Sequence, residues 1–474
     1  MNAHLLAAEA APKLDYAATA FVLVCASLVL MMTPALALFY GGMTRSKSVL
    51  NMMMMSFGAL GVVGIIYVLY GYSMSFGTHD IAGLFANPGD KFGLHNVADV
   101  FNSFGYEGYG NIPELAFVGF QLTFAGLTVA LISGAIADRV KFSTWLVFSA
   151  IWATIVYFPI AHMVWGGGFL GGTDHGIAAS MFGSADGKAT FAPIDFAGGT
   201  VVHINAGMAG LVLALVVGRR KGFGRVPMRP HNVPLTMIGA GLLWFGWFGF
   251  NAGSELAADS SAALVWVNTT AATCAAMIGW LVVEKVKEGH ATSIGAASGV
   301  VAGLVAITPA CGALSPVGSL ILGAVAGILS ALAVSLKFKF NLDDSLDVVG
   351  VHLVSGLWGT IGAGLLSTTN GLLYGKGYEQ TVVQIVIAFG CLAFTGVLTA
   401  IIGLALKAIM GWRIDHDDEL AGIDSAEHAE SAYDFGGFAS GTRVGHGLLP
   451  SGHGPLGGGS TIGAEHNDPR GAQA

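Results

Sequence analysis

The chain has 474 residues, of which 54% are hydrophobic and 11% are charged, and its formal net charge is -8. Soluble globular domains carry about twice this share of charged residues, so an ordinary cytosolic protein is excluded. Much of the acidity lies in expected loops and in the C-terminal tail, so the net charge identifies no partner. The four cysteines lie in apolar runs without disulfide or metal-ligand spacing, which predicts packing roles, no metal site and no cofactor.

Charge-poor segments recur along the chain, each long enough for a helix to cross a bilayer. Seven of them lie at about 16–44, 49–77, 113–137, 142–173, 195–218, 233–254 and 261–283. The run from Ala291 to Leu336 is too long for one crossing, and Pro309 and Pro316 near its middle predict two helices joined by a tight turn. Segments at about 348–373 and 380–406 follow. The sequence therefore predicts an all-α polytopic membrane protein with eleven transmembrane helices.

Basic residues occupy alternate connections between these segments. They are Arg45 and Lys47, Arg139 and Lys141, the group Arg219, Arg220, Lys221, Arg225 and Arg229, then Lys285 and Lys287, Lys337 and Lys339, and Lys407 and Arg413. The remaining connections hold only Lys91, Lys188 and Lys376, and Lys13 precedes the first segment. Because Lys and Arg in short loops favour the cytoplasmic side, we expect the N-terminus outside and the C-terminus inside, which agrees with an odd helix count.

A short motif occurs twice, once in the fifth and once in the tenth predicted helix. Asp195 to Gly207 reads DFAGGTVVHINAG and Asp344 to Gly356 reads DSLDVVGVHLVSG, so both fit D-x7-H-x3-G. Five helices in each half would invert the second copy, and the two His would approach a shared site from opposite membrane directions. The pattern predicts two inverted five-helix repeats plus one C-terminal helix. Chance similarity between Gly-rich and Val-rich helices is the alternative.

Ionisable side chains within a bilayer are costly, so each one is a candidate functional residue. Those expected here are Asp195, His203, His352, His162 and Glu114. Packing best explains a lone His, but two at repeat-related positions can share one hydrogen and offer a polar step to a small neutral solute. A metal site is the rival interpretation, and neither His has the spacing that would complete its ligands. Asp195 also fits a helix N-cap, and a carboxylate there could also ease the desolvation of a cation.

Aromatic side chains converge with small polar ones toward the expected extracellular level. They are Phe120, Gln121 and Phe124 on the third helix, Trp165 on the fourth, and Trp247, Phe250, Asn251 and Ser254 on the sixth. Any one of these rings is best explained by packing or by anchoring at the lipid interface. Their convergence instead favours a cage that attracts a small cation through cation-π interactions, with a Ser hydroxyl accepting one N–H hydrogen bond.

Three segments closely resemble the ammonium transporter family, namely residues 195–207, FGWFGFNAGS at 245–254 and DDSLDVVGVHLVSGLWG at 343–359. Less specific support comes from residues 39–56, 120–142 and 158–172, and the likeness covers about residues 16–433. Trp165 favours the bacterial-type ammonium transporter branch over the related Rhesus proteins, whose outer site is not expected to carry that Trp.

The resemblance implies roles for particular residues. Phe124, Trp165 and Ser254 would form an outer ammonium recruitment site with Asp195 in support, and Phe120 is placed in the same site. Phe124 and Phe250 would stack below it as a gate, and His203 and His352 would be twin pore histidines. The family further implies that the ammonium ion gives up its proton before ammonia crosses an apolar pore.

The resemblance also implies an organisation of the chain and its partners. We expect an extracytoplasmic N-terminus at 1–15, the transporter domain at 16–410, a cytoplasmic regulatory segment at 411–433 and a Gly-rich disordered tail at 434–474. The family implies a homotrimer in the cell (inner) membrane and a PII-type regulator at 411–433. The long connection from Gly172 to Pro193 departs from the family pattern and would cover the pore mouth or contact a periplasmic component.

Three other functions are alternatives to transport. A sensor would bind ammonium and report it through the C-terminal segment, and the absence of a fused kinase, cyclase or receiver domain counts against it. An intramembrane enzyme would need a nucleophile with its base or a metal cluster, and no HExxH, GxSxG or paired-carboxylate motif occurs. A potassium channel would need a TVGYG filter, which is missing. The sequence therefore predicts a transporter that is not an enzyme and binds no nucleic acid.

Overall fold

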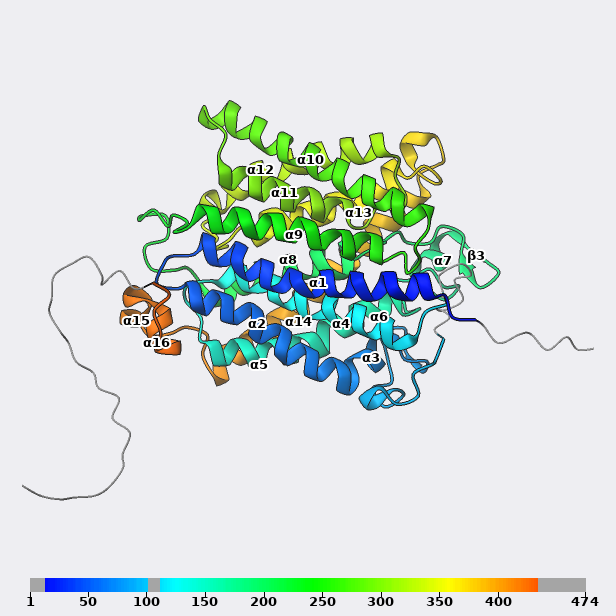
Figure 1. Ribbon diagram of the computed structural model, residues 1–474, viewed down its shortest axis with the longest axis horizontal. Coiled ribbons are helices and arrows are strands. Elements are labelled where there is room, and N and C mark those ends of the chain that lie inside the picture. The colour runs from blue at the N-terminus through cyan, green and yellow to red at the C-terminus, as the bar shows by residue number, and fades with distance from the viewer. Residues whose placement is uncertain (1–12, 101–110, 434–474) are drawn as a thin grey trace, which may run out of the picture. The chain divides into compact units, whose positions relative to one another are not determined.

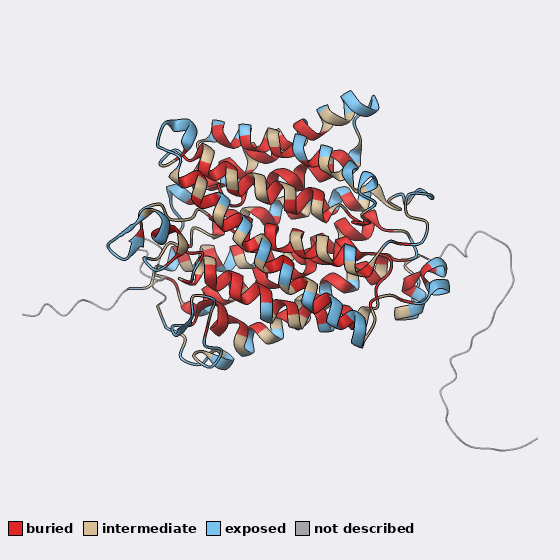
Figure 2. Ribbon diagram, turned by 180° about the vertical axis from the view of Figure 1, so that it is seen from behind, coloured by how far each residue is buried: buried red, intermediate tan, exposed pale blue. Residues whose placement is uncertain are grey.

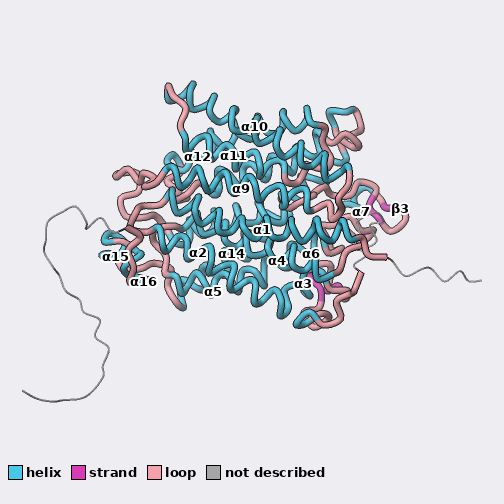
Figure 3. The backbone as a smooth tube through the Cα atoms, viewed as in Figure 1, coloured by secondary structure: helices cyan, strands magenta, loops and turns pink. Residues whose placement is uncertain are grey.

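The computed structural model describes residues 13–100 and 111–433. This part of the chain is a bundle of long helices that run side by side, with the loops gathered at its two ends (Figures 1 and 3). The α-helices of the first half are α1 (Tyr16–Met43), α2 (Val49–Ile66), α3 (Tyr72–Phe76), α4 (Glu114–Ile132), α5 (Phe142–Trp152), α6 (Phe158–Trp165), α7 (Ile177–Phe182) and α8 (Asn205–Val217). Those of the second half are α9 (Val233–Gly253), α10 (Ser260–Glu288), α11 (Ser293–Ile307), α12 (Pro316–Lys339), α13 (Val354–Leu366), α14 (Glu379–Ile409), α15 (His416–Ala421) and α16 (Ile423–His428).

Shorter elements interrupt or connect these helices. The π-helical turns are η1 (Tyr67–Gly71), η4 (Ala153–Tyr157), η5 (Gly199–Ile204) and η6 (Val349–Leu353), and the 3-10 turns are η2 (Phe92–Leu94), η3 (Ser133–Ile136) and η7 (Leu372–Tyr374). Two antiparallel hairpins pair β1 (Asp80–Ile81) with β2 (Phe85–Ala86) and β3 (Ser184–Ala185) with β4 (Lys188–Ala189). Both hairpins lie in connections and not in the bundle.

The membrane-spanning elements agree with the sequence prediction. Ten helical spans in the described residues are long and apolar enough to cross a membrane, and the shorter apolar helix α11 brings the number to the eleven predicted. The expected break between Pro309 and Pro316 is confirmed, because α11 ends at Ile307 and α12 begins at Pro316. The Ser315 hydroxyl caps α12 by accepting from the Gly318 amide. The chain is therefore a multi-pass membrane protein.

The helix contacts repeat between the two halves of the bundle. In the first half α2 packs on α4 and α5, and α1 packs on α4; in the second half α10 packs on α11 and α12, and α9 packs on α11. The first helices of the two halves, α1 and α9, pack along each other, and the fifth, α8 and α13, each contact the π-helical turn that precedes the other. This matched pattern is what two five-helix repeats require, and α14 follows as the eleventh helix.

Burial separates the interior of the bundle from its perimeter. Interior helix faces are buried, while exposed positions gather in the connections and on outward faces (Figure 2). Large apolar side chains such as Ile65, Leu215 and Val397 are more than half exposed. Outward apolar side chains suit a hydrocarbon surrounding, where a soluble protein would place polar ones.

Arginines and carboxylates from four connections interlock at one end of the bundle, called here the Arg220 end. Arg220 pairs with Asp343 at 2.8 Å and with Asp138 at 3.2 Å, and Arg45 lies 3.5 Å from Asp138. Buried Arg139 donates to the Asp343 carbonyl at 2.8 Å. The basic connections predicted to share one side of the membrane therefore do meet at one end.

The segment 411–433 folds back onto the Arg220 end of its own chain. The Asp424 carboxylate accepts from the Leu50 and Asn51 amides at 3.0 and 2.8 Å, and so caps the first turn of α2. Glu427 accepts from the Phe142 amide at the start of α5 at 2.9 Å. Helices α15 and α16 are thereby held at this end (Figure 1). Residues 1–12 of the predicted N-terminal segment 1–15, and the whole predicted tail 434–474, lie outside the described residues.

Candidate functional site

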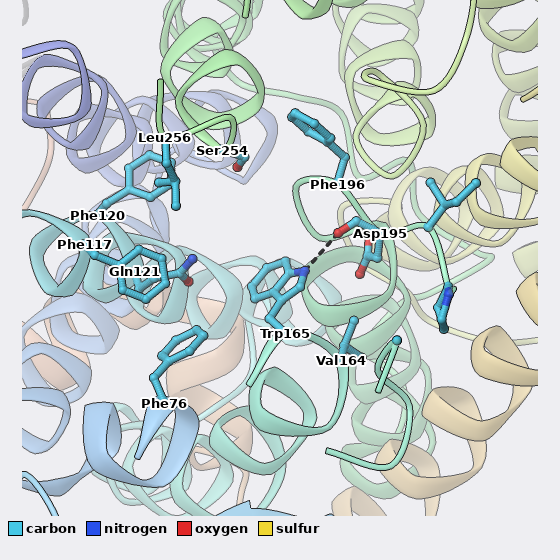
Figure 4. Close-up of a pocket in the computed structure, with 13 residues that line it drawn as sticks. Phe76, Phe117, Phe120, Gln121, Val164, Trp165, Asp195, Phe196, Ser254 and Leu256 are labelled. Atoms are coloured by element: carbon cyan, nitrogen blue, oxygen red, sulfur yellow. Dashed lines mark hydrogen bonds between the residues drawn. The ribbon is translucent and has the colours of Figure 1, made fainter. Parts of the chain in front are cut away.

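A cavity of about 300 Å³ opens at the opposite end of the bundle, called here the Trp165 end. Its walls come from α3, α4, α6, the segment before η5 and the end of α9 (Figure 4). The lining residues are Phe76, Phe117, Phe120, Gln121, Val164, Trp165, Gly172, Pro193, Ile194, Asp195, Phe196, Ser254 and Leu256. Aromatic rings thus surround a small number of polar groups.

Trp165 and Asp195 are joined at one side of this cavity. The Trp165 indole Nε1 donates to the Asp195 carbonyl at 2.9 Å, which fixes the plane of the ring (Figure 4). The Asp195 carboxylate accepts from the backbone amides of Gly198, Thr200 and Val201, each at 3.1 Å. Asp195 therefore caps the start of η5, as one sequence interpretation expected, and its main chain holds Trp165 in place.

Ser254 contributes a hydroxyl to the same cavity from the end of α9. Its Oγ donates to the Phe250 carbonyl one turn earlier at 2.8 Å. The donated hydrogen is used inside the helix, so the lone pairs of Ser254 are left to accept from a solute.

A stack of two phenylalanines lies beneath the cavity. The rings of Phe124 and Phe250 are 4.1 Å apart between centroids and are inclined by 18°. Phe124 also meets Trp165 edge to face at 6.2 Å and lies 4.8 Å from Phe120. Both rings of the stack are fully buried. The stack therefore separates the cavity from the interior of the bundle.

Two imidazoles follow on the far side of the stack. The His203 ring lies 6.0 Å from the Phe250 ring and stacks on Trp247 at 5.4 Å. His203 and His352 stack with centroids 5.4 Å apart, and their Nδ1 atoms are 3.3 Å apart. Nε2 of His203 is buried and has no hydrogen-bond partner in the described structure. The cavity, the stack and the imidazoles thus form one continuous column.

The repeated motif explains how the two imidazoles meet. Each His lies in a π-helical turn, η5 or η6, and the carboxylate of each motif Asp accepts from backbone amides at the start of its own turn. The Asp344 carboxylate accepts from the Val348 and Val349 amides at 3.1 and 2.8 Å, as Asp195 does in the first copy. π-Helical turns displace one residue from the regular helix and are frequent at functional sites.

The final Gly of each motif allows the two turns to cross closely. A Cβ on Gly207 would lie 2.5 Å from the Leu353 nitrogen, next to His352. A Cβ on Gly356 would lie 3.2 Å from the Cβ of His203. Each motif therefore supplies one imidazole and the glycine against which the other motif packs.

The eight residues to which the family resemblance assigns roles fall in this column, whereas the other ionisable candidates, His162 and Glu114, do not line the cavity. The cavity is lined by Phe120, Trp165, Asp195 and Ser254, and the deeper residues are Phe124, Phe250, His203 and His352. Sequence reasoning missed the lining residues Phe76, Phe117 and Leu256, which no spacing signal in their own segments marks. Across residues 13–100 and 111–433, no group of three or more His, Cys, Asp or Glu side chains is arranged to hold a metal ion.

Residues 20–433 match the model of the Ammonium Transporter Family. A protein named ammonium transporter from Mycobacterium tuberculosis is 51% identical over 440 residues, which cover 88% of this chain and 90% of that protein. Another of that name from Aquifex aeolicus is 46% identical, covering 89% of this chain and 94% of that one.

Solved structures agree in fold. A structure described as a sensor Amt protein superposes with a TM-score of 0.76 at 26% identity, covering 87% of this chain and 98% of that one. Mep2 from Saccharomyces cerevisiae superposes with a TM-score of 0.74 at 29% identity, covering 85% and 91%.

Proposed function

This chain belongs to the Ammonium Transporter Family, and we propose that it moves ammonium or ammonia across the membrane along the column from the Trp165 cavity to the two histidines. The observation that carries the proposal is the uninterrupted order of an aromatic cavity, a phenylalanine stack and a buried imidazole pair. No covalent chemistry is involved, and its relatives are transporters and not enzymes.

The cavity would recruit the ammonium ion. Trp165 and Phe120 present ring faces or edges to it, and a cation held at an aromatic face gains about 0.5 to 2 kcal/mol. The Ser254 hydroxyl accepts one N–H hydrogen bond. Asp195 adds a carboxylate at the cavity wall, which lowers the cost of removing a cation from water.

The stack of Phe124 and Phe250 would act as a gate. At a centroid separation of 4.1 Å no solute fits between the rings, so they must move apart for each passage. An ion that enters a dry, apolar passage loses its water without compensation. Ammonium can avoid this cost by giving up a proton, whereas a potassium ion of similar size cannot. Selectivity follows from that difference.

The two histidines would carry the neutral solute onward. A shared hydrogen between Nδ1 of His203 and Nδ1 of His352 leaves one remaining ring nitrogen as an acceptor and the other as a donor. Such a pair offers ammonia both kinds of hydrogen bond in an otherwise apolar passage.

We place the Trp165 end outside and the Arg220 end in the cytoplasm of a cell (inner) membrane. The basic connections clustered at the Arg220 end support this orientation. The family resemblance supports a homotrimer and a PII-type regulator at residues 411–433. The sensor alternative has one observation in its favour, which is the likeness to a structure described as a sensor Amt protein.

The test is current across a supported membrane that carries the purified protein in liposomes. A jump in ammonium chloride should give a saturable current, which requires that the proton released before the apolar passage also crosses the membrane, and an equal jump in potassium chloride should give none. Trp165→Leu should raise the ammonium concentration at half-saturation by about tenfold, as expected for the loss of a cation-π contact. Trp266→Leu is the matched control, because this Trp is about half exposed on α10.

Equal currents with both salts would contradict selective transport. Binding of ammonium without any current would favour neutral ammonia conduction or the sensor, and a stopped-flow pH assay of the liposomes separates these two outcomes.

A further inference from the structure

His162 on α6 is buried and bonded at both ring nitrogens. Nδ1 lies 3.1 Å from the Ser75 carbonyl oxygen, and Nε2 lies 2.8 Å from Oδ1 of Asp80. A carbonyl and an ionised carboxylate only accept hydrogen bonds, so the imidazole satisfies both when each nitrogen carries a hydrogen. The Asp80 side chain is 46% exposed, which keeps its carboxylate in contact with solvent. The pair thus joins a buried imidazole to a surface carboxylate.

This pair stands directly behind two walls of the Trp165 cavity. Ser75, which accepts from His162, immediately precedes the lining residue Phe76. Trp165 follows His162 by one helical turn. The His162 carbonyl also accepts from the Gly166 and Gly168 amides, at 2.9 and 3.1 Å. One residue therefore fixes the wall on α3, the end of α6 and the turn that follows Trp165.

Asp80 extends the same connection into the β1–β2 hairpin. Its second carboxylate oxygen accepts from the Gly83 amide at 2.9 Å, which closes the hairpin turn. The Gly83 carbonyl in turn accepts from the Phe169 amide at 2.8 Å, four residues beyond Trp165. The hairpin is thereby joined to α6 on both sides of Trp165.

The chain beyond the hairpin is tied to the opposite wall of the cavity. Lys91 pairs with Glu114 at the first residue of α4, and the Tyr72 hydroxyl donates to Glu114 at 2.6 Å. Helix α4 carries the lining residues Phe117 and Phe120. The connection from residue 77 to 98, called here the strap, thus links the helix that holds Trp165 to the helix that faces it.

We propose that His162 and Asp80 are positioning residues that set the place of Trp165 relative to the aromatic rings of α4. The pair touches no solute, and it acts through the walls of the cavity. This inference rests on the proposed function, because it assumes that the cavity recruits ammonium. Cation-π attraction depends on the distance to the ring face, so a displaced Trp165 weakens recruitment without closing the deeper column.

The test is saturable ammonium current in liposomes for His162→Gln, Asp80→Ala and the double variant. Each single change should raise the half-saturation concentration by about tenfold and leave the maximal current unchanged, as the loss of a cation-π contact does. The double variant should match the single ones, because both changes break one interaction. Asp80→Asn should recover most of the affinity, since its amide oxygen still accepts from His162.

His175→Gln is the matched control, because neither His175 nor Asp174 in its ion pair lines the cavity, and their side chains are 73% and 47% exposed. Trp165→Leu separates the two proposals. If Trp165→Leu raises the half-saturation concentration and the His162 and Asp80 variants do not, positioning is overturned while recruitment stands. If Trp165→Leu itself has no effect, the recruitment role fails.

A fall in maximal current with unchanged half-saturation would show a merely structural role and would also overturn the proposal. Asp80→Ala keeps this test available if His162→Gln does not fold, because it leaves the buried imidazole intact.

Discussion

Nδ1 of His203 lies 3.3 Å from Nδ1 of His352, and the two rings are inclined by only 19°. One hydrogen can lie between these atoms, so the two neutral rings must adopt opposite tautomers. The ring that donates at Nδ1 keeps a lone pair at Nε2, and the ring that accepts carries its hydrogen at Nε2. Of the two Nε2 atoms, that of His203 belongs to the ring that contacts Phe250 of the phenylalanine stack. This atom is buried and has no hydrogen-bond partner in the described residues.

Replacing His203 with Ala should lower the ratio of ammonium to potassium current by about tenfold or more, the effect of one lost hydrogen bond of about 1.4 kcal/mol in a dry passage. The variant removes the stack on Trp247 and leaves His352 without its partner. Current after matched jumps in ammonium and potassium chloride measures the ratio. His290→Ala, at an exposed residue after α10, is the control. A wild-type ratio in His203→Ala would refute the twin-histidine role.

Replacing Phe250 with Leu should increase proton leak through the protein severalfold. The change breaks the 4.1 Å stack on Phe124 and lets water approach His203. Collapse of a pH gradient across liposomes, without ammonium, measures the leak. Phe248→Leu is a matched control two residues away, because the Phe248 ring stacks on Trp266 at 4.6 Å and takes no part in the column. Equal leak in the two variants would argue against a gate.

The helices and the imidazole pair could be predicted from sequence for physical reasons. A bilayer demands long apolar helices, and Pro309 and Pro316 mark the break between α11 and α12. The D-x7-H-x3-G repeat could be recognised because its residues have local structural roles. Each Asp caps a π-helical turn, and Gly207 and Gly356 lie where the two turns cross. Within each copy of the motif these residues lie only a few positions apart, so their spacing is visible in the sequence.

Contacts between distant segments could not be predicted in the same way. His162 meets Asp80 across 82 positions, and Asp424 meets Asn51 across 373. No periodicity relates such residues, and a single sequence holds no record of their pairing. Phe76 and Phe117 were missed for the same reason, because only the packing of α3 against α4 brings them to one cavity.

Glu255 should make ammonium recruitment dependent on pH. Burial and the nearby charge of Asp259 raise the pKa of Glu255 to about 7, and its neighbours Ser254 and Leu256 line the cavity. The side chain is negative above that pH, so the half-saturation concentration should fall about twofold between about pH 6 and about pH 8, the size of a partly exposed charge interaction. Glu255→Gln should reduce the change, because the Asp195 carboxylate also lines the cavity, and Glu288→Gln, at the other end of α10, should leave it as in the unchanged protein. An undiminished pH effect in Glu255→Gln would show that another group causes it.

Asp343 should make the bundle sensitive to acid. Burial alone would raise the pKa of Asp343, but the hydrogen bonds and charge of Arg220 overcome it and hold the pKa below its ordinary value of 3.8. A carboxyl with a lowered pKa in the folded state stabilises the fold above its unfolded pKa, and this contribution is lost as the pH falls through the folded value. Asp343→Asn should therefore lower the Tm at neutral pH and flatten its fall below about pH 4. Asp186→Asn, in the exposed turn between β3 and β4, should change neither. An unchanged acid response in Asp343→Asn would contradict the assignment.

The last prediction concerns the attachment of residues 411–433 to the Arg220 end. Asp424→Ala removes the carboxylate that accepts from the Leu50 and Asn51 amides, and the loss of such a cap costs about 0.5 to 2 kcal/mol. The bundle has its own buried core, so the lost free energy should loosen the attachment of the segment and leave the stability of the bundle helices unchanged. Limited proteolysis with a glutamate-specific protease should then cut after Glu427 severalfold faster, while the Tm of the bundle changes little. Asp417→Ala is the matched control, because that side chain is fully exposed and lies on the same segment. Equal cleavage rates in the two variants would show that the Asp424 cap does not hold the segment in place.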